Sequence, residues 1–227
     1  LRFNGMWAFV IFDRKNKVLF GSRDRFGVKP FYYFKDQHHF AFASEIKSLL
    51  SVPQVIKKEM NKKAVYDYLV FGWQEMEEEG FFKGIYELMP AHSFEYDLSK
   101  GRFKKWKYYT LNYTDNWEPF KQEKNQEYIK KIQELLQQSI KYRLRSDVPI
   151  GTCLSGGVDS SSIVCIINDL LNSESLSQIG PKQKVFTASF DNYQFDESNW
   201  AKMVVDQTKT TWYQTYPKSS ELLADLE

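Results

Sequence analysis

The sequence predicts a mixed α/β protein whose two halves are built differently. In the first half, short aromatic runs are separated by polar turn residues, which is typical of antiparallel strands. In the second half, apolar runs alternate with helical patterns, which predicts a parallel, doubly wound sheet. The chain has 227 residues, of which 42% are hydrophobic and 17% aromatic, so it can form one large or two ordinary domains.

Four apolar runs between positions 5 and 44 indicate consecutive hairpin strands. They are GMWAFVIFD, KVLFGSRD, KPFYYFKD and HFAFAS. Because the runs show little polar alternation, we expect both faces of their sheet to be covered, as in a layered sandwich. His38 directly precedes the last run and His39 begins it, and neighbouring side chains on a strand point to opposite faces. We therefore expect surface or turn histidines there, and no metal site together with His92.

Two short helices and a polar loop are expected after these strands. Residues 44–50 form the first helix with Ser44 as its cap, and residues 62–69 form the second. The acidic stretch QEMEEEG at 74–80 is typical of a solvated loop.

A further hairpin is expected from residues 87–98 and 101–111, which flank the turn Ser99-Lys100-Gly101. Residues 112–124 contain Pro119 and show no hydrophobic period, so we place a domain linker there. The first domain therefore covers 1–111 and the second 125–227.

The second half begins with a helix of about residues 125–145. Its apolar residues repeat at spacings of three and four: Ile129, Ile132, Leu135, Leu136, Ile140 and Leu144. A strand, glycine turn and helix follow over 148–171. The later elements are a strand at 184–190, a helix at about 197–208 and a short strand at 212–216. In such a fold, ligands bind at the carboxyl ends of the strands, where the glycine turn lies.

That turn reads LSGGVDSSSIV at positions 154–164 and predicts a phosphate site. Gly156 and Gly157 allow positive φ and close approach of an anion. Backbone N–H groups at the helix start would face that anion, and Ser155, Ser160 and Ser161 add hydroxyl donors. The lysine of a Walker A loop is absent, and a GxGxxG pattern is not matched. Glycine packing and helix capping remain a simpler interpretation of single residues in this string.

Asp159 is informative because a carboxylate beside a phosphate is repulsive unless a cation lies between them. Magnesium is the usual cation, and we therefore predict that Asp159 binds Mg²⁺.

Composition excludes several classes of protein. The net charge is +2, with 31 basic and 29 acidic residues, which gives no support for nucleic-acid binding. No stretch is long and apolar enough to predict a membrane span or a leader. Cys153 and Cys165 form no paired framework, which favours a reducing, cytoplasmic location. Residue 1 is Leu within a strand-like run, so we expect the chain to be part of a longer protein.

SGGVDS after an apolar strand resembles the phosphate loop of the ATP-pyrophosphatase superfamily, whose members adenylylate a substrate oxygen. The strings GMWAFVIFD, GSRDRFGVKPFYY and FAFASEIKSLL are similar to the latter part of the glutaminase domain of glutamine-dependent asparagine synthetase. SDVPIGTCLSGGVDSS and ASFDNYQFDESNWAKMV resemble that family's synthetase domain. The resemblance covers nearly the whole chain. It implies a partial αββα glutaminase domain of the Ntn type, followed by a doubly wound ATP-pyrophosphatase domain.

The resemblance implies residue roles as well. Ser155, Gly156, Gly157, Asp159 and Ser160 would hold the β and γ phosphates of ATP, and Asp159 would also bind Mg²⁺. Leu154 and the strand residue near Ser189 would lie against the adenosine through backbone contacts. Aspartate and glutamine would be the other substrates of the intact protein. A homodimer is a further expectation.

The family's amino-terminal catalytic Cys has no counterpart in this chain, so we expect no catalytic residue of glutamine hydrolysis here. Asn4-Gly5 belongs to a later strand than the family's oxyanion pair, and we reject Asn4 as catalytic. Cys153 is expected to be a core residue, and Cys165 is expected to pack on its helix. Lys209 stands where the family usually has glycine, and Trp212-Tyr213 where a His pair is common.

The departures leave two alternatives to asparagine synthesis. One is a relative that closes an amide ring by the same adenylylation, such as a β-lactam synthetase or a lasso-peptide cyclase. The other belongs to another class and is a catalytically inactive scaffold or regulatory module that keeps the fold.

Overall fold

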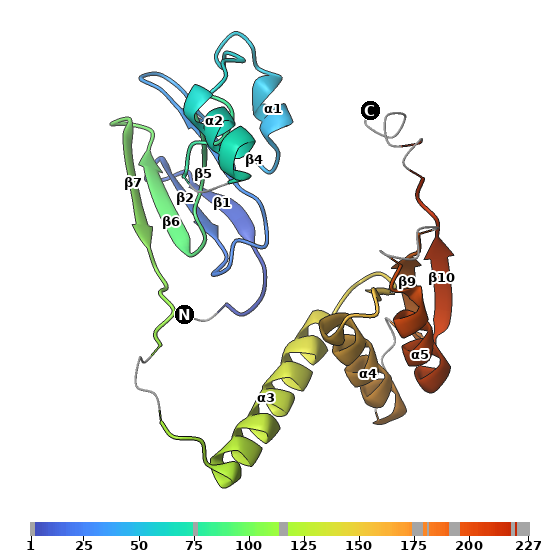
Figure 1. Ribbon diagram of the computed structural model, residues 1–227. Helices are drawn as coiled ribbons and strands as arrows, with labels where there is room; N and C mark the ends of the chain where they lie inside the picture. The colour runs from blue at the N-terminus through green and yellow to red at the C-terminus, as the bar shows by residue number, and fades with distance from the viewer. Residues whose placement is uncertain are drawn as a thin grey trace. The chain divides into compact units, whose positions relative to one another are not determined.

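The computed structural model describes residues 3–74, 77–113, 118–173, 179–180, 182–190, 196–218 and 221. The chain forms two compact units, Leu1–Asn116 and Trp117–Glu227, each with its own sheets and helices (Figure 1). α3 begins at Gln122, within the stretch 112–124 that the sequence marks as a linker.

The first unit contains two antiparallel sheets; the aromatic runs by themselves suggested consecutive hairpins of one sheet, whereas the family resemblance implied more than one. The four-stranded sheet has the order β1-β2-β6-β7, with β1 Ala8–Asp13, β2 Val18–Arg23, β6 His92–Asp97 and β7 Arg102–Lys107. The three-stranded sheet has the order β4-β3-β5, with β3 Tyr32–Lys35, β4 Phe40–Ala43 and β5 Ile85–Glu87. The four expected early strands and the later hairpin are confirmed, whereas β5 was not predicted.

An aromatic core joins the two sheets face to face. Its buried residues are Phe31, Tyr33, Leu88, Phe94 and Tyr96, with Phe40 and Phe103 packed against them. The rings of Phe40 and Tyr96 are stacked with centroids 4.6 Å apart. Aromatic rings supply large apolar area, which explains how runs this short hold two sheets together.

The helices of this unit are α1 Ile46–Leu50 and α2 Lys62–Phe71. α1 packs over β3 and β4, where Leu49 and Ile85 form a second buried cluster. The three-stranded sheet is therefore apolar on both faces. The four-stranded sheet leaves Ile11 56% exposed, so the expected covering of both faces does not hold there. Ser44 is not the cap of α1: the N-cap is Glu45, whose side chain makes no capping hydrogen bond.

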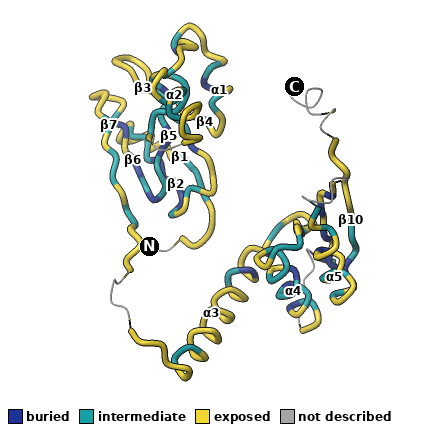
Figure 2. Tube along the Cα trace, in the orientation of Figure 1, coloured by how far each residue is buried: buried dark blue, intermediate teal, exposed yellow. Residues whose placement is uncertain are grey.

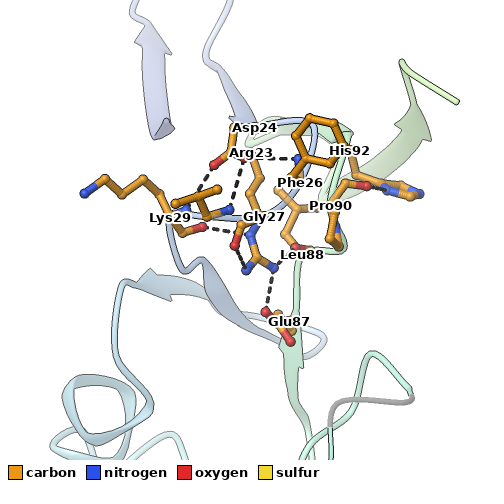
Figure 3. A network of polar contacts seen from close by, with 10 residues as sticks. Arg23, Asp24, Phe26, Gly27, Lys29, Glu87, Leu88, Pro90 and His92 are labelled. Atoms are coloured by element: carbon orange, nitrogen blue, oxygen red, sulfur yellow. Dashed lines mark hydrogen bonds and ion pairs between the residues drawn. The ribbon is translucent and has the colours of Figure 1, made fainter. Parts of the chain in front are cut away.

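A buried polar network fixes the connection between the two sheets (Figure 3). The guanidinium of Arg23, 5% exposed, donates to Glu87 Oε1 at 2.5 Å and to the carbonyl of Leu88 at 2.6 Å. It also donates to the carbonyls of Gly27 and Lys29, both at 2.8 Å. Because every contact is an acceptor, the buried charge is satisfied, and the loop after β2 is tied to β5.

The negatively charged Asp24 also stabilises the loop after β2. Asp24 is 1% exposed. Its carboxylate accepts hydrogen bonds from the backbone N–H groups of Trp7, Phe26, Val28 and Lys29. Burial acts to raise the pKa of this carboxyl, but the backbone donors outweigh it and hold the pKa below its usual value.

The second unit contains a parallel sheet with the order β10-β9-β8, formed by β8 Thr152–Cys153, β9 Lys184–Ala188 and β10 Thr211–Thr215. Its helices are α3 Gln122–Arg143, α4 Val158–Ser173 and α5 Ser198–Thr208. The predicted alternation of strands and helices is confirmed. Lys209 ends α5 with a φ of +55°, the left-handed region that favours glycine.

α4 and α5 pack beside one face of this sheet. Leu154, Val164, Val185 and Ala201 form the buried cluster there. On β9 and β10, Phe186 and Tyr213 are 45% and 46% exposed, and their rings stack with centroids 5.2 Å apart. The parallel sheet is thus established, and the described helices bury one of its two faces.

α3 is a long helix with little packing, as its mainly exposed trace in Figure 2 shows. Ile129, Ile132 and Leu135 are 49%, 63% and 52% exposed, whereas Ile140 is 7% exposed and packs with α4 residues. Only the last turns of the apolar stripe therefore contribute to the core. Among the residues that the structure describes, no helix is both long and apolar enough to cross a membrane.

Candidate functional site

The loop between β8 and α4 lies where a strand of the parallel sheet ends and a helix begins. The N–H of Leu154 donates to the carbonyl of Phe186 at 2.8 Å, so the chain leaves the sheet directly into the loop. Leu154 is 1% exposed, whereas Ser155 and Asp159 are exposed. The loop therefore has a fixed base and an accessible rim.

Two serine hydroxyls hold the loop in a closed turn. Ser155 Oγ lies 3.1 Å from Ser160 Oγ, and Ser160 Oγ donates to the carbonyl of Gly157 at 3.2 Å. The N–H groups of Ser155 and Gly157 donate to the Ser160 and Ser155 hydroxyls, respectively, both at 3.3 Å. The structure thus brings Ser155, Gly157 and Ser160 together, as the motif suggests.

The fold requires glycine at position 156 but not at position 157. Gly156 has a φ of +99°, and a Cβ there would lie 2.7 Å from the carbonyl oxygen of Glu197 and 2.9 Å from the N of Ala201. Gly156 is therefore required by both its backbone angle and the close approach of α5. Gly157 does not have a positive φ, and a Cβ there would only meet Ser155 Oγ at 3.5 Å. The expectation of positive φ at both glycines is correct for Gly156 alone.

The N-terminus of α4 faces the same loop. Because the first N–H groups of a helix have no acceptor within it, those of Val158, Asp159 and Ser160 are available to an anion, and the helix dipole favours that anion. Asp159 is exposed in this first turn.

The exposed carboxylate of Asp159 suits a magnesium ion that is bound together with a phosphate ligand. Mg²⁺ is usually held by one or two carboxylates together with phosphate oxygens and waters, so a single exposed carboxylate fits this role. In the described ranges, no three His, Cys, Asp or Glu residues cluster as a complete protein metal site. Asp159 could therefore hold the ion only in combination with a ligand.

Leu154 and Ser189 lie at the same edge of the sheet but have few free backbone groups. Ser189 is 2% exposed, and its N–H donates to the carbonyl of Thr215 at 2.9 Å. Its hydroxyl accepts from Gln214 Nε2 at 3.0 Å. Since the N–H of Leu154 is used within the sheet and its carbonyl accepts from Thr187 Oγ1, a ligand would meet these residues through the Ser189 carbonyl or by packing.

Sequence reasoning missed the residues below the loop. Thr187 Oγ1 donates to the carbonyl of Leu154 at 2.7 Å, and Trp212 Nε1 donates to Thr187 Oγ1 at 2.8 Å. These residues are close because β8, β9 and β10 are neighbours in register. The departure at Trp212 was visible in the sequence, but its partner was not.

One further expectation, the burial of Cys153, needs correction. Cys153 is exposed, because at the end of the two-residue strand β8 its side chain lies away from the buried cluster. Cys165 is half-buried on α4, and burial raises the pKa of its thiol. His38 and His39 lie in a turn, as expected, where His39 Nδ1 is 3.0 Å from Asp36 Oδ2.

The first unit contains a cavity of about 110 Å³ that is separate from the predicted site. It is lined by residues of α2, β3, β5 and the 77–82 segment, and also by Trp73 and Gln74 after α2. Glu77 pairs with Lys63, Glu78 with Lys105, and Gly84 N–H donates to Glu79 at 2.6 Å. The described part of the acidic stretch is thus partly built into the fold, whereas Glu75 and Met76 lie outside the described residues.

Comparison with known families divides the chain in the same order. The model of a glutamine amidotransferase domain matches residues 1–109, and the model of asparagine synthase matches residues 131–227. The class of protein is therefore a glutamine amidotransferase domain joined to an asparagine synthase domain.

Individual relatives support the same assignment. A Methanocaldococcus jannaschii protein provisionally named glutamine-hydrolysing asparagine synthetase 2 is 37% identical over 220 residues, which is 96% of this chain and 40% of the relative. Glutamine-hydrolysing asparagine synthetase 3 of Bacillus subtilis is 31% identical over 231 residues, or 99% of this chain and 36% of the relative. The amidase chyE of Penicillium rubens is 33% identical over 195 residues, 82% of this chain and 27% of the relative.

The chain belongs to the glutamine-dependent asparagine synthetase family. It spans 40% or less of the length of these three relatives.

Proposed function

We propose that residues 154–160 bind the phosphates of ATP, and that the whole protein makes asparagine from aspartate, glutamine and ATP. The observation that carries the proposal is the loop itself. It combines the Ser155–Ser160 hydroxyl pair, the close approach at Gly156 and the free N–H groups of α4 at one edge of a parallel sheet. Membership of the asparagine synthetase family supports the choice of ATP.

Each residue has a stated role in this proposal. The hydroxyls of Ser155 and Ser160 donate hydrogen bonds to the β and γ phosphates. These bonds replace the hydrogen bond between the two hydroxyls. Gly156 and Gly157 let the phosphate approach the backbone. Asp159 would hold Mg²⁺, which supplies positive charge that stabilises the departing pyrophosphate.

The adenosine would lie along the edge formed by Leu154 and Ser189. The Leu154 carbonyl already accepts from Thr187 Oγ1, so Leu154 would offer an apolar floor and Ser189 its backbone carbonyl. The N–H groups of both residues already donate within the sheet, so they would not take part in binding the adenosine.

The proposed reaction activates a poor electrophile. The β-carboxylate of aspartate attacks the α-phosphorus of ATP, a P–O bond forms, and pyrophosphate leaves. Ammonia from glutamine hydrolysis then attacks the β-aspartyl-AMP, so that a C–N bond forms and AMP departs. We place the glutaminase part at residues 1–111 and the synthetase part at 125–227, joined by 112–124. A cytoplasmic homodimer completes the proposal.

A second candidate is adenylylation of a different acceptor. The amidase name of the Penicillium relative, together with Trp212-Tyr213 in place of a common His pair, favours considering amide chemistry on another substrate. Pyrophosphate release that requires a carboxylate other than aspartate would distinguish this candidate.

The test uses the whole protein with Asp159→Ala. We expect aspartate-dependent pyrophosphate release to be abolished while glutamine hydrolysis stays largely intact, because Asp159 lies only in the proposed ATP site. Equal loss of both activities would show that Asp159 supports folding instead.

A further inference from the structure

We infer that Thr187 and Trp212 are positioning residues for the phosphate loop, acting through a directed chain of hydrogen bonds that ends at the carbonyl of Leu154. This inference rests on the proposed binding of ATP phosphates by residues 154–160. Neither side chain belongs to the loop, and both come from neighbouring strands of the parallel sheet, β9 and β10.

The chemistry of the three groups sets the direction of the chain. Trp212 Nε1 lies 2.8 Å from Thr187 Oγ1, and Thr187 Oγ1 lies 2.7 Å from the carbonyl oxygen of Leu154. An indole N–H can only donate and a carbonyl can only accept. The Thr187 hydroxyl therefore accepts from Trp212 and donates its proton to Leu154, with no alternative orientation.

The groups in this series of hydrogen bonds are buried, so the loss of one bond is costly. Thr187 is 4% exposed and Leu154 is 1% exposed, and Trp212 packs against the same apolar cluster as Leu154. Water has little access to the Leu154 carbonyl, so loss of the Thr187 hydroxyl would leave a buried acceptor without its donor. Such a group is costly enough for the local backbone to rearrange.

The peptide bond after Leu154 transmits this constraint to the loop. Because the peptide unit is planar, fixing the Leu154 carbonyl also fixes the direction of the Ser155 N–H. That N–H donates to Ser160 Oγ at 3.3 Å, and the Ser155 hydroxyl lies 3.1 Å from the same oxygen. The plane is thus held from both sides, and its rotation would separate the two serine hydroxyls.

Replacement of Thr187 separates the hydroxyl from the shape of the side chain. We expect Thr187→Val to weaken Mg-ATP binding about tenfold in isothermal titration, because two buried partners lose their bonds. Thr187→Ser keeps the hydroxyl, and its affinity is expected to stay within about twofold of the parent chain. Equal affinities for Val and parent, or equal losses for Val and Ser, would overturn the inference.

Trp212→Phe tests the donor while keeping an aromatic ring in the cluster. The Trp212 indole signal in a ¹⁵N spectrum is assigned by its loss in Trp212→Phe. Both this signal and the Ser155 amide signal are expected to shift in Thr187→Val and not in Thr187→Ser. Binding losses of Trp212→Phe and Thr187→Val should be non-additive in the double variant, since both act through one hydroxyl.

The spectra also separate this inference from the proposed function. If the parent chain gives no heat with Mg-ATP, the proposed nucleotide binding fails. The positioning of Ser155 is then decided by the spectra alone: a Ser155 amide that shifts in Thr187→Val but not in Thr187→Ser supports it. An unmoved amide in both variants overturns it.

Discussion

Gly156 and Gly157 are adjacent, but only Gly156 is constrained by the fold. Its φ of +99° and the 2.7 Å approach of a Cβ to the Glu197 carbonyl leave no room for another residue. Gly157 has an ordinary φ and space for a Cβ. The two positions therefore allow the demands of folding to be separated from the demands of the ligand.

We predict that Gly156→Ala lowers the free energy of unfolding of the chain by about 1–3 kcal/mol, because of strain and the clash with α5. Gly157→Ala should change that free energy by less than about 1 kcal/mol and instead weaken Mg-ATP binding, since its Cβ lies where the phosphate would approach. Denaturant unfolding and titration measure the two effects. Equal destabilisation by both variants would contradict this distinction.

Asp24 supplies a prediction with a defined pH dependence. Its folded-state pKa is held below the unfolded value, so the carboxylate stabilises the fold above about pH 4 and loses this contribution as the pH falls towards the folded pKa. Asp24→Asn should cost on the order of 1–3 kcal/mol at neutral pH because the backbone donors lose a charged acceptor.

Denaturant unfolding at neutral and acidic pH measures this difference between parent and Asp24→Asn. The difference is expected to shrink below about pH 4. Asp147→Asn, at an exposed position, is the control and should show no such trend. A constant difference across the pH range would exclude the carboxylate charge as the source of the stability.

At the residue scale, the loop was predictable because its residues are close together in the sequence. Ser155, Gly156 and Ser160 lie within six positions, and local spacing was enough to bring them together. Thr187 and Trp212 were not predictable, because their contact depends on the register of β9 against β10. Cys153 was expected in the core, but an apolar neighbourhood in sequence does not specify which face of a short strand a side chain occupies.

At the element scale, the strands and helices followed their patterns, while their assembly did not. The aromatic runs became strands as expected, but the buried Arg23 and Asp24 turn the chain from one sheet into another. Composition alone did not indicate this division. β5 was missed because it has only three residues, which is too short for a periodic pattern.

α3 offers a matched pair of substitutions within one helix. Ile140 is 7% exposed and Ile132 is 63% exposed. Ile140→Ala should lower the free energy of unfolding by about 2–4 kcal/mol through loss of buried area and cavity formation. Ile132→Ala should change it by less than about 0.5 kcal/mol, since alanine favours the helix and little contact is lost.

Loss of helical circular dichroism during denaturant unfolding measures both α3 variants. Similar costs at the two positions would indicate that the apolar face of the first turns is buried in solution. That outcome would contradict the packing of α3 through its last turns alone.

At the scale of the whole molecule, the two compact units correspond to two different kinds of sheet. The amidotransferase model matches 1–109 and the asparagine synthase model 131–227. The change from antiparallel to parallel strands was evident from the sequence, because turn-linked runs and strand–helix alternation are distinct patterns. The second helical layer of a doubly wound sheet is not established, since α4 and α5 pack beside one face.

The central claim is that the loop of residues 154–160 binds Mg-ATP through Asp159, and isothermal titration of the 227-residue chain tests it most directly. We predict saturable binding by the parent and at least about tenfold weaker binding by Asp159→Asn, because the variant loses the charge that holds Mg²⁺. Asp169→Asn, exposed on the same helix, should bind like the parent. Absence of binding by the parent, or equal affinities for parent and Asp159→Asn, would contradict the claim.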